Sequence, residues 1–127
     1  MERSVIVSSE VPGAIGPYSV GIQAGDLIFV SGTIGVDPAT GEFVPGGVEA
    51  QTRQVLTNIS KVLAAAGSSM QSVLKTTVFL TDLGEFSSMN EVYAGFFQKE
   101  PPARSTIEVS ALPAGALVEI EAIAIRS

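Results

Sequence analysis

Residues 72–83, SVLKTTVFLTDL, decide the fold of this 127-residue chain. The run is apolar and rich in β-branched side chains, which is typical of a strand that is covered on both faces. Behind it, apolar residues recur at the spacing of one helix face, namely Phe86, Met89, Val92, Tyr93, Phe96 and Phe97. The sequence KEPPA (99–103) ends that helix, and a further strand is predicted over 104–110. This order predicts two parallel strands joined by a right-handed crossover.

The rest of the chain adds strands and one more helix. Short apolar runs predict four further strands, at residues 4–7, 18–23, 27–33 and 117–126. Residues 37–42 are dense in turn formers and predict a tight loop. A second helical stripe runs from Val48 to Ala66 and stops at Gly67. We therefore expect a single α+β domain over residues 1–127, with one mixed sheet and two helices on one face.

The composition indicates that the second face of this sheet does not simply meet water. Charged residues make up only 16% of the chain and hydrophobic residues 46%, whereas charged residues make up about 25% of a typical soluble domain. A small domain with so few charges cannot cover its whole surface with them. The sequence therefore predicts self-association through part of that surface.

Composition also excludes several classes of chemistry. The chain contains no cysteine and no histidine, so it has no thiol nucleophile, lacks the usual general base, and has few ligands for zinc, copper or iron–sulfur clusters. The net charge of −6 opposes nucleic-acid binding. No apolar run reaches the length of a membrane span, and the N-terminus has no signal-peptide core. We expect a cytoplasmic protein without nucleic-acid or membrane partners.

Arg104 is the first candidate site residue. On a strand it shares one face with Thr106 and Glu108, and the preceding Pro101 and Pro102 restrict the backbone there. Its planar fork of donors fits a carboxylate at two points, so it could hold a small acid. The alternative is a surface arginine in an ordinary ion pair.

Two further stretches could contribute polar groups. Glu119 and Glu121 share one face of the last strand, where Glu119 could hold a water and move a proton, or could simply be solvated. Ser31 and Gly32 end a strand, and their backbone N–H groups could donate to a ligand; the alternative is a glycine-permitted bulge.

Three other side chains fit either a cleft or an ordinary structural role. Tyr18, at a predicted strand start, could reach into a cleft or be a half-buried aromatic. Asn90, in the middle of the second helix, is a cleft donor or a solvent-facing residue. Lys75 could be a Schiff-base amine, but nothing nearby favours this over a snorkelling or paired lysine.

In combination, these stretches resemble the RidA family, also called YjgF. The resemblance covers essentially the whole chain and rests on four segments, GAIGPYSVG (13–21), VSGTIGVDPATGE (30–42), VFLTDLGEFSSMNEVYAGFF (78–97) and PPARSTIEVSALPAGALVEIEAIA (101–124). It implies a chorismate-mutase-like fold with the last strand inside the sheet. It also implies a homotrimer with a barrel-like centre and clefts between neighbouring subunits.

The resemblance also implies an activity that needs neither metal nor organic cofactor. Members hydrolyse reactive enamines and imines, such as 2-aminoacrylate and 2-aminocrotonate, to 2-oxo acids and ammonia. The family's carboxylate-binding arginine matches Arg104, and its glutamate in V-E-I matches Glu119. Its remaining substrate-binding positions match Tyr18, Ser31, Gly32, Asn90 and Thr106.

Thr106 departs from the cysteine that many members have at this position, but a hydroxyl keeps the hydrogen-bonding capacity. The alternative functions are a regulatory protein that binds small carboxylates without turnover and an endoribonuclease or translation inhibitor. Net charge −6 and the absence of histidine weigh against the latter.

Overall fold

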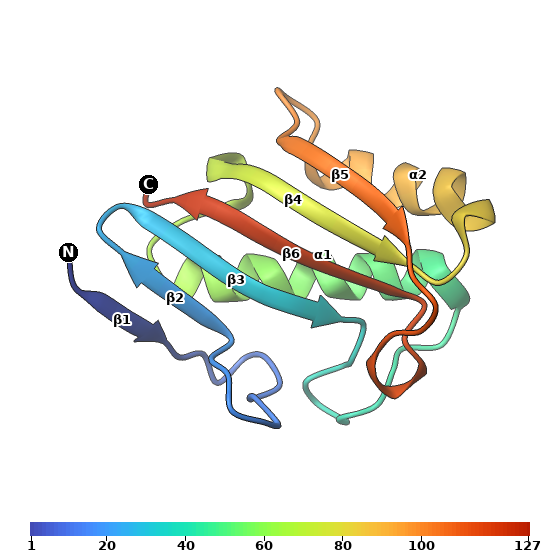
Figure 1. Ribbon diagram of the computed structural model, residues 1–127, viewed down its shortest axis with the longest axis horizontal. Coiled ribbons are helices and arrows are strands. Elements are labelled where there is room, and N and C mark those ends of the chain that lie inside the picture. Colours follow the sequence, from blue (N-terminus) through green and yellow to red (C-terminus); the bar gives the residue numbers. More distant parts are fainter.

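A computed structural model of the chain describes residues 1–127 as a six-stranded sheet with two helices on one face (Figure 1). The strands are β1 (Arg3–Ile6), β2 (Gly21–Ala24), β3 (Leu27–Ile34), β4 (Val73–Leu80), β5 (Ala103–Glu108) and β6 (Val118–Ile125). The helices are α1 (Gly47–Ala65) and α2 (Phe86–Phe96), with short 3-10 turns η1 (Met70–Ser72), η2 (Leu83–Glu85) and η3 (Pro113–Gly115). The α+β architecture predicted from the sequence is confirmed.

The strand order in the sheet is β1-β2-β3-β6-β4-β5. β4 and β5 pair in parallel and are joined by α2, as the 72–83 stretch predicted. All other pairs are antiparallel. β6 lies between β3 and β4, so the last strand is inside the sheet and β5 is left at its edge.

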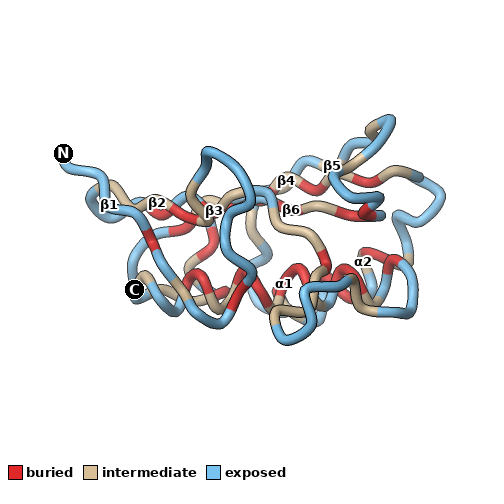
Figure 2. Tube along the Cα trace, turned by 90° about the horizontal axis from the view of Figure 1, so that it is seen from below, coloured by how far each residue is buried: buried red, intermediate tan, exposed pale blue.

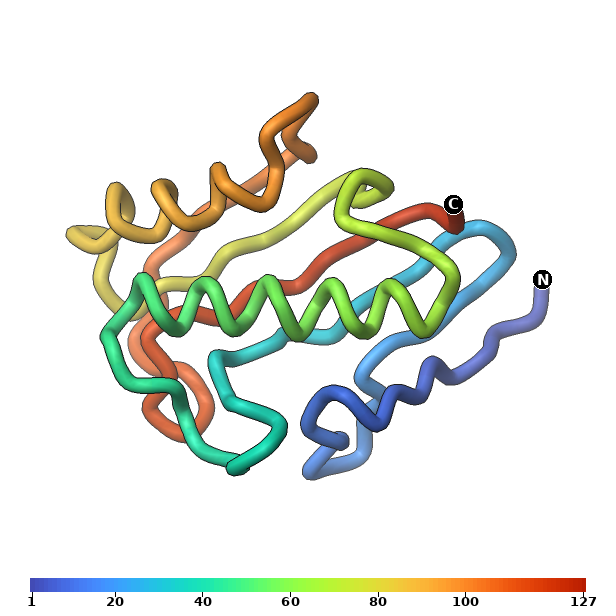
Figure 3. The backbone as a smooth tube through the Cα atoms, turned by 180° about the vertical axis from the view of Figure 1, so that it is seen from behind, coloured from blue at the N-terminus to red at the C-terminus, as the bar shows by residue number.

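The core fills the layer between the helices and one face of the sheet (Figures 2 and 3). α1 buries the stripe that the sequence predicted, including Val55, Leu56 and Ile59, against alternate residues of the sheet. On β6 the buried residues are Val118, Ile120, Ala122 and Ala124, each at most 2% exposed. Gly67 follows α1 with φ +75°, a conformation that glycine adopts without steric cost, so the helix stops there.

The opposite face of the sheet has no cover within the chain (Figure 2). The strand over 72–83 was expected to be covered on both faces, but Lys75 is exposed and Thr77 and Phe79 are only half-buried. Large apolar side chains also stand on this open face, among them Phe29 at 42% exposure. Within one chain, β4 is therefore covered on the helix side only.

One predicted strand boundary is wrong. The strand predicted over 18–23 begins at Gly21, and Tyr18 lies in the loop before it. The N–H of Tyr18 donates to the carbonyl of Gly16, 2.8 Å away, which folds the backbone locally. No helix of the chain has the length and apolar character needed to cross a membrane.

Candidate functional site

Arg104 lies near the start of β5, on the face of the sheet that α2 covers. Its Nη1 donates to Oδ1 of Asn90 at 2.7 Å. Its Cζ lies 4.7 Å from the ring centre of Tyr93 and 5.5 Å from that of Phe86. The guanidinium thus stands in an open hollow at the edge of the sheet, lined by residues of α2 and by the two prolines before β5.

No carboxylate pairs with Arg104, although the chain has 13 acidic residues. The only ion pair joins Arg126 and Asp26, 3.7 Å apart on the surface. The interpretation of Arg104 as an arginine in an ordinary ion pair is therefore wrong. Its one side-chain hydrogen bond, to Asn90, leaves most of its five N–H groups free for an anion.

Thr106 stands two residues further along β5, on the same face as Arg104. Its Oγ1 is buried and has no hydrogen-bond partner. An unpartnered buried hydroxyl is costly, so such a group in native proteins calls for a specific explanation. Its position beside Arg104 is consistent with a donor and acceptor kept for a bound molecule.

Glu119 lies at the start of β6, on the open face. It alternates with Val118 and Ile120, which are fully buried under the helices. Desolvation by burial, followed by the neighbouring charge of Glu121, raises the pKa of Glu119 above the ordinary value of a glutamate. The carboxyl is therefore more basic than usual, which suits a group that takes and returns a proton.

Gly32 makes room for this carboxyl. A Cβ at Gly32 would lie 2.5 Å from Oε2 and 2.8 Å from Cδ of Glu119. β3 also gains one residue here, since Val30 pairs with Ala122 whereas Thr33 pairs with Ile120. The predicted alternative of a bulge at this point is thus confirmed, and the bulge brings the backbone of Gly32 against Glu119.

Ser31 donates both of its hydrogen bonds within the chain. Its N–H bonds to the carbonyl of Val20 at 3.0 Å, and its hydroxyl donates to the carbonyl of Ser19 at 2.5 Å. The expectation that the N–H of Ser31 donates to a ligand is therefore wrong. Tyr18 is half-exposed and lines one hollow together with Ser31 and Gly32, so these three residues lie on one side of the molecule.

Within one chain, Arg104 and Glu119 lie too far apart to contact one small substrate. Glu119 stands opposite Phe79 of β4, and Phe79 stands opposite Ile107 of β5. Since Ile107 is three residues beyond Arg104, the two backbones are separated by about 10 Å along the strands and about 10 Å across them. Their side chains also point to opposite faces of the sheet.

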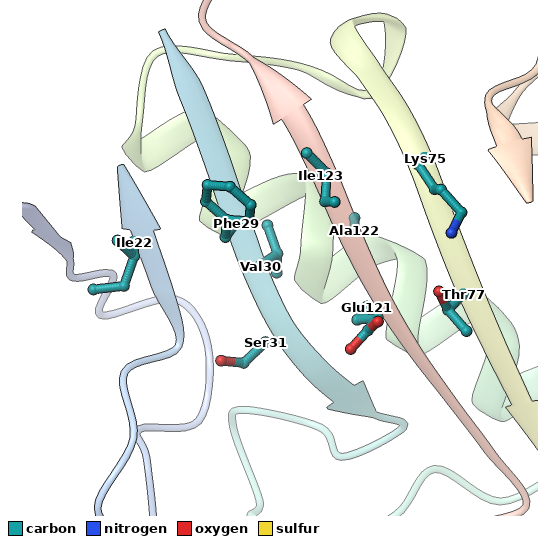
Figure 4. A pocket seen from close by; sticks show the side chains of 9 residues that line it. All are labelled: Ile22, Phe29, Val30, Ser31, Lys75, Thr77, Glu121, Ala122 and Ile123. Atoms are coloured by element: carbon teal, nitrogen blue, oxygen red, sulfur yellow. The ribbon is translucent and has the colours of Figure 1, made fainter. Parts of the chain in front are cut away.

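The open face of the sheet carries apolar and charged groups together (Figure 4). Phe29 and Ile123 stand there beside Lys75, Thr77 and Glu121. Lys75 forms no ion pair, so the interpretation as a paired lysine is wrong. The chain contains no cluster of three or more acidic side chains that could hold a metal ion.

The sequence interpretation missed the two rings beside Arg104. Phe86 and Tyr93 were assigned to the apolar stripe of α2, without any contact to a charged group. The available signal was their spacing around Asn90, since residues four and three positions apart share one helix face. That spacing does not reveal which strand the face meets, so only the fold brings Arg104 to it.

Comparison with known proteins places relatives along the whole chain. The sequence profile of the family described as endoribonuclease L-PSP matches residues 8–126. A RutC family protein of Pyrococcus horikoshii is 51% identical over 98% of each chain. The mouse protein named 2-iminobutanoate/2-iminopropanoate deaminase is 47% identical over 98% of this chain and 92% of its own.

Solved structures share the fold along the whole chain as well. The crystal structure of E. coli TdcF with bound serine is 46% identical to this chain and superposes with a TM-score of 0.93. The match covers 98% of this chain and 99% of that one.

Proposed function

The chain belongs to the endoribonuclease L-PSP family, and from this premise we propose that it hydrolyses reactive 2-enamine and 2-imino acids to 2-oxo acids and ammonia. The predicted resemblance to RidA is confirmed, because a chloroplast protein of Arabidopsis thaliana named Reactive Intermediate Deaminase A is 48% identical over 98% of this chain and 66% of its own. The proposed substrates are 2-aminoacrylate and 2-aminocrotonate with their imine tautomers.

The free guanidinium of Arg104 is the observation that carries this proposal. Arg104 is the one arginine of the four that is not exposed, and it is held by Asn90 and two aromatic rings instead of a carboxylate, so its charge is left for an anion from outside the chain. Two charge-assisted hydrogen bonds to a substrate carboxylate contribute roughly 1.5–3 kcal/mol each. We assign Arg104 as the group that holds the substrate carboxylate, with Asn90 and Thr106 beside it.

The active cleft lies between two chains in this proposal. Arg104 and Glu119 occupy opposite faces within one chain, so a substrate that contacts both needs Arg104 from one subunit and Glu119 from its neighbour. The open apolar face and the low charge content support self-association through that face. A homotrimer, with the open faces forming a barrel-like centre, provides three equivalent clefts.

The reaction proceeds by addition of water to the C=N carbon. Glu119 accepts a proton from the bound water, whose oxygen forms a bond to the carbon, and returns that proton to the nitrogen to give a carbinolamine. Glu119 then takes the hydroxyl proton and passes it to the amino group, so that the C–N bond breaks, the C=O bond forms and ammonia leaves. Orientation by Arg104 and one proton carrier account for a modest acceleration of a reaction that already occurs in water. Gly32 and Tyr18 border the same side of the cleft as Glu119.

The activity is tested by generating the substrate in place. Threonine dehydratase and threonine supply 2-aminocrotonate, and the rate of 2-oxobutanoate release is measured with and without the protein. A rate that does not change at any protein concentration contradicts the proposal.

A mixed assembly tests whether the cleft is shared. Arg104→Ala and Glu119→Gln chains are each expected to be inactive alone. When the two are co-expressed and assort at random, about a quarter of the interfaces combine an intact Arg104 with an intact Glu119. Recovery of about a quarter of wild-type activity supports the shared cleft, and no recovery in assembled mixtures contradicts it.

Carboxylate binding without turnover is the second candidate. The TdcF structure with bound serine favours it, since serine carries a carboxylate. Glu119 argues for turnover, because a pure carboxylate receptor gains nothing from a nearby negative charge. The threonine dehydratase assay separates the two candidates.

The predicted cytoplasmic location stays a prediction.

A further inference from the structure

Three side chains of α2 surround the Arg104 guanidinium, and the structure assigns to Tyr93 the role of positioning it for a carboxylate. Phe86, Asn90 and Tyr93 are spaced four and three residues apart, so they share one face of the helix. The inference rests on the proposed function, in which Arg104 holds the substrate. Tyr93 acts through Arg104 and is therefore a positioning residue.

The two rings hold the cation without occupying its donors. Cζ of Arg104 lies 4.7 Å from the ring centre of Tyr93 and 5.5 Å from that of Phe86, both within the range of a cation–π contact. A carboxylate in their place would bind the planar fork and compete with the substrate. Aromatic neighbours leave the charge intact and the N–H groups available.

Tyr93 is itself fixed from the neighbouring strand. Its hydroxyl and Oγ1 of Thr76 form a buried hydrogen bond of 2.6 Å, and its ring packs against Phe97 at a centroid distance of 4.7 Å. Thr76 stands directly opposite Arg104 in the parallel pair of β4 and β5. The residue beside Arg104 in the sheet therefore holds the ring over which Arg104 lies.

The protonation state of Tyr93 agrees with this role. Burial raises its pKa above the usual value of a tyrosine, while the hydrogen bond with Thr76 and the nearby Arg104 oppose that rise. The phenol remains neutral, so it does not form an ion pair with Arg104.

Four variants distinguish the contribution of the Tyr93 ring from that of its hydroxyl. Tyr93→Leu removes the ring, Tyr93→Phe and Thr76→Val each remove one end of the buried hydrogen bond, and the fourth variant combines the last two. Phe96→Leu is the control, because Phe96 is an aromatic residue of the same helix that packs against the core and is not one of the two rings in cation–π contact with Arg104.

The first measurement reads Arg104 directly by NMR. The chain has only four arginines, Arg3, Arg53, Arg104 and Arg126, so the spectrum of their Nε–H groups is simple, and Arg104→Lys assigns the signal. We expect a ring-current shift for the Nε–H signal of Arg104 in the wild type. The part of this shift due to Tyr93 should be lost in Tyr93→Leu and kept in Phe96→Leu.

The second measurement reads carboxylate recognition. Calorimetry gives Kd for 2-oxobutanoate and for 2-oxobutanamide, which lacks the carboxylate. Tyr93→Leu should weaken 2-oxobutanoate binding roughly 3- to 30-fold, the range of a lost cation–π contact, without changing the amide. Tyr93→Phe and Thr76→Val should have smaller effects of equal size, and their combination should be no worse than either alone.

These measurements distinguish this inference from the proposed function. If the protein hydrolyses no imine but Tyr93→Leu still loses the Arg104 signal and the carboxylate preference, the proposed function fails and the inference stands. If a folded Tyr93→Leu variant keeps both, the inference is overturned, whatever the activity. Fully additive effects of Tyr93→Phe and Thr76→Val would equally overturn the part assigned to their hydrogen bond.

Discussion

The two faces of the sheet differ in how they treat charge. On the helix face, Arg104 is bordered by α2, with a hydrogen bond to Asn90 and two rings beside it. On the open face, Glu119 lies against the backbone of Gly32 and near a second acid, without a cation of its own. In the proposed site, these two faces supply a cationic half and an anionic half that come together only where two chains meet.

Removing the cationic half should have the largest effect. Arg104→Ala deletes the charge-assisted hydrogen bonds to the substrate carboxylate, so kcat/KM in the threonine dehydratase assay should fall about 100-fold or more. Arg104→Lys keeps the charge without the planar fork and should recover only part of this loss. The size of the assembly should not change, because the proposal assigns assembly to the open apolar face and not to Arg104. Unchanged 2-oxobutanoate formation would reject the role of Arg104.

A charge on the open face should separate the two halves by preventing assembly. Phe29→Glu places a carboxylate on the apolar part of that face, where burial of an unpaired charge costs several kcal/mol. Sedimentation velocity should show monomers, and the fraction of activity lost should match the fraction of chains that are monomeric. Leu83→Glu is the matched control, since Leu83 in η2 is 44% exposed and Phe29 42%. Equal assembly of both variants would contradict the assignment of the open face as the interface.

Displacing the Glu119 carboxylate with a larger residue at position 32 should lower turnover without unfolding the protein. In Gly32→Ala the added Cβ meets the carboxylate of Glu119, whose side chain is flexible enough to move away. We expect kcat to fall about tenfold, as for partial loss of a general base. Gly95→Ala in α2, with no atom within 4 Å of the added Cβ, should behave as wild type. A wild-type kcat in Gly32→Ala would mean that the position of Glu119 is unimportant.

The smallest effect concerns stability and pH. Because the pKa of Glu119 is raised in the folded state, its ionised form destabilises the fold at neutral pH, and this cost disappears as pH falls below the usual glutamate range. Glu119→Gln should therefore raise Tm slightly at pH 7, with no gain over the wild type in acid. Thermal denaturation across this pH range measures the difference. An increase in Tm that is the same at every pH would contradict the assignment of this effect to the ionisation of Glu119.

Hydrophobic periodicity predicted the strands that carry Arg104 and Glu119, but not whether the two residues lie on the same face of the sheet. The alternation along 117–126 correctly separated Glu119 from Val118 and Ile120, and the alternation along 104–110 correctly grouped Arg104 with Thr106. Whether these two sets share a face depends on which strands lie between them. The sequence pattern alone did not place the last strand inside the sheet; that expectation came from the resemblance.

Contacts made by folding account for the remaining differences. The donors of Ser31 bond to Ser19 and Val20, a loop contact that no local pattern specifies. The aromatic neighbours of Arg104 come from a helix that reads as an ordinary apolar stripe. In both cases the residue types were visible in the sequence, while their partners were set by packing over longer distances.

The central position of β6 has a consequence for how the chain reaches its native state. Leu27 pairs with Ile125, 98 residues further along the 127-residue chain. Until β6 is present, β3 and β4 each expose a row of unpaired backbone groups in the middle of the sheet, the kind of edge that recruits other chains. Completion of the sheet therefore depends on the most distant contacts, which makes folding slow relative to helical proteins of this size and exposes unfinished chains to aggregation.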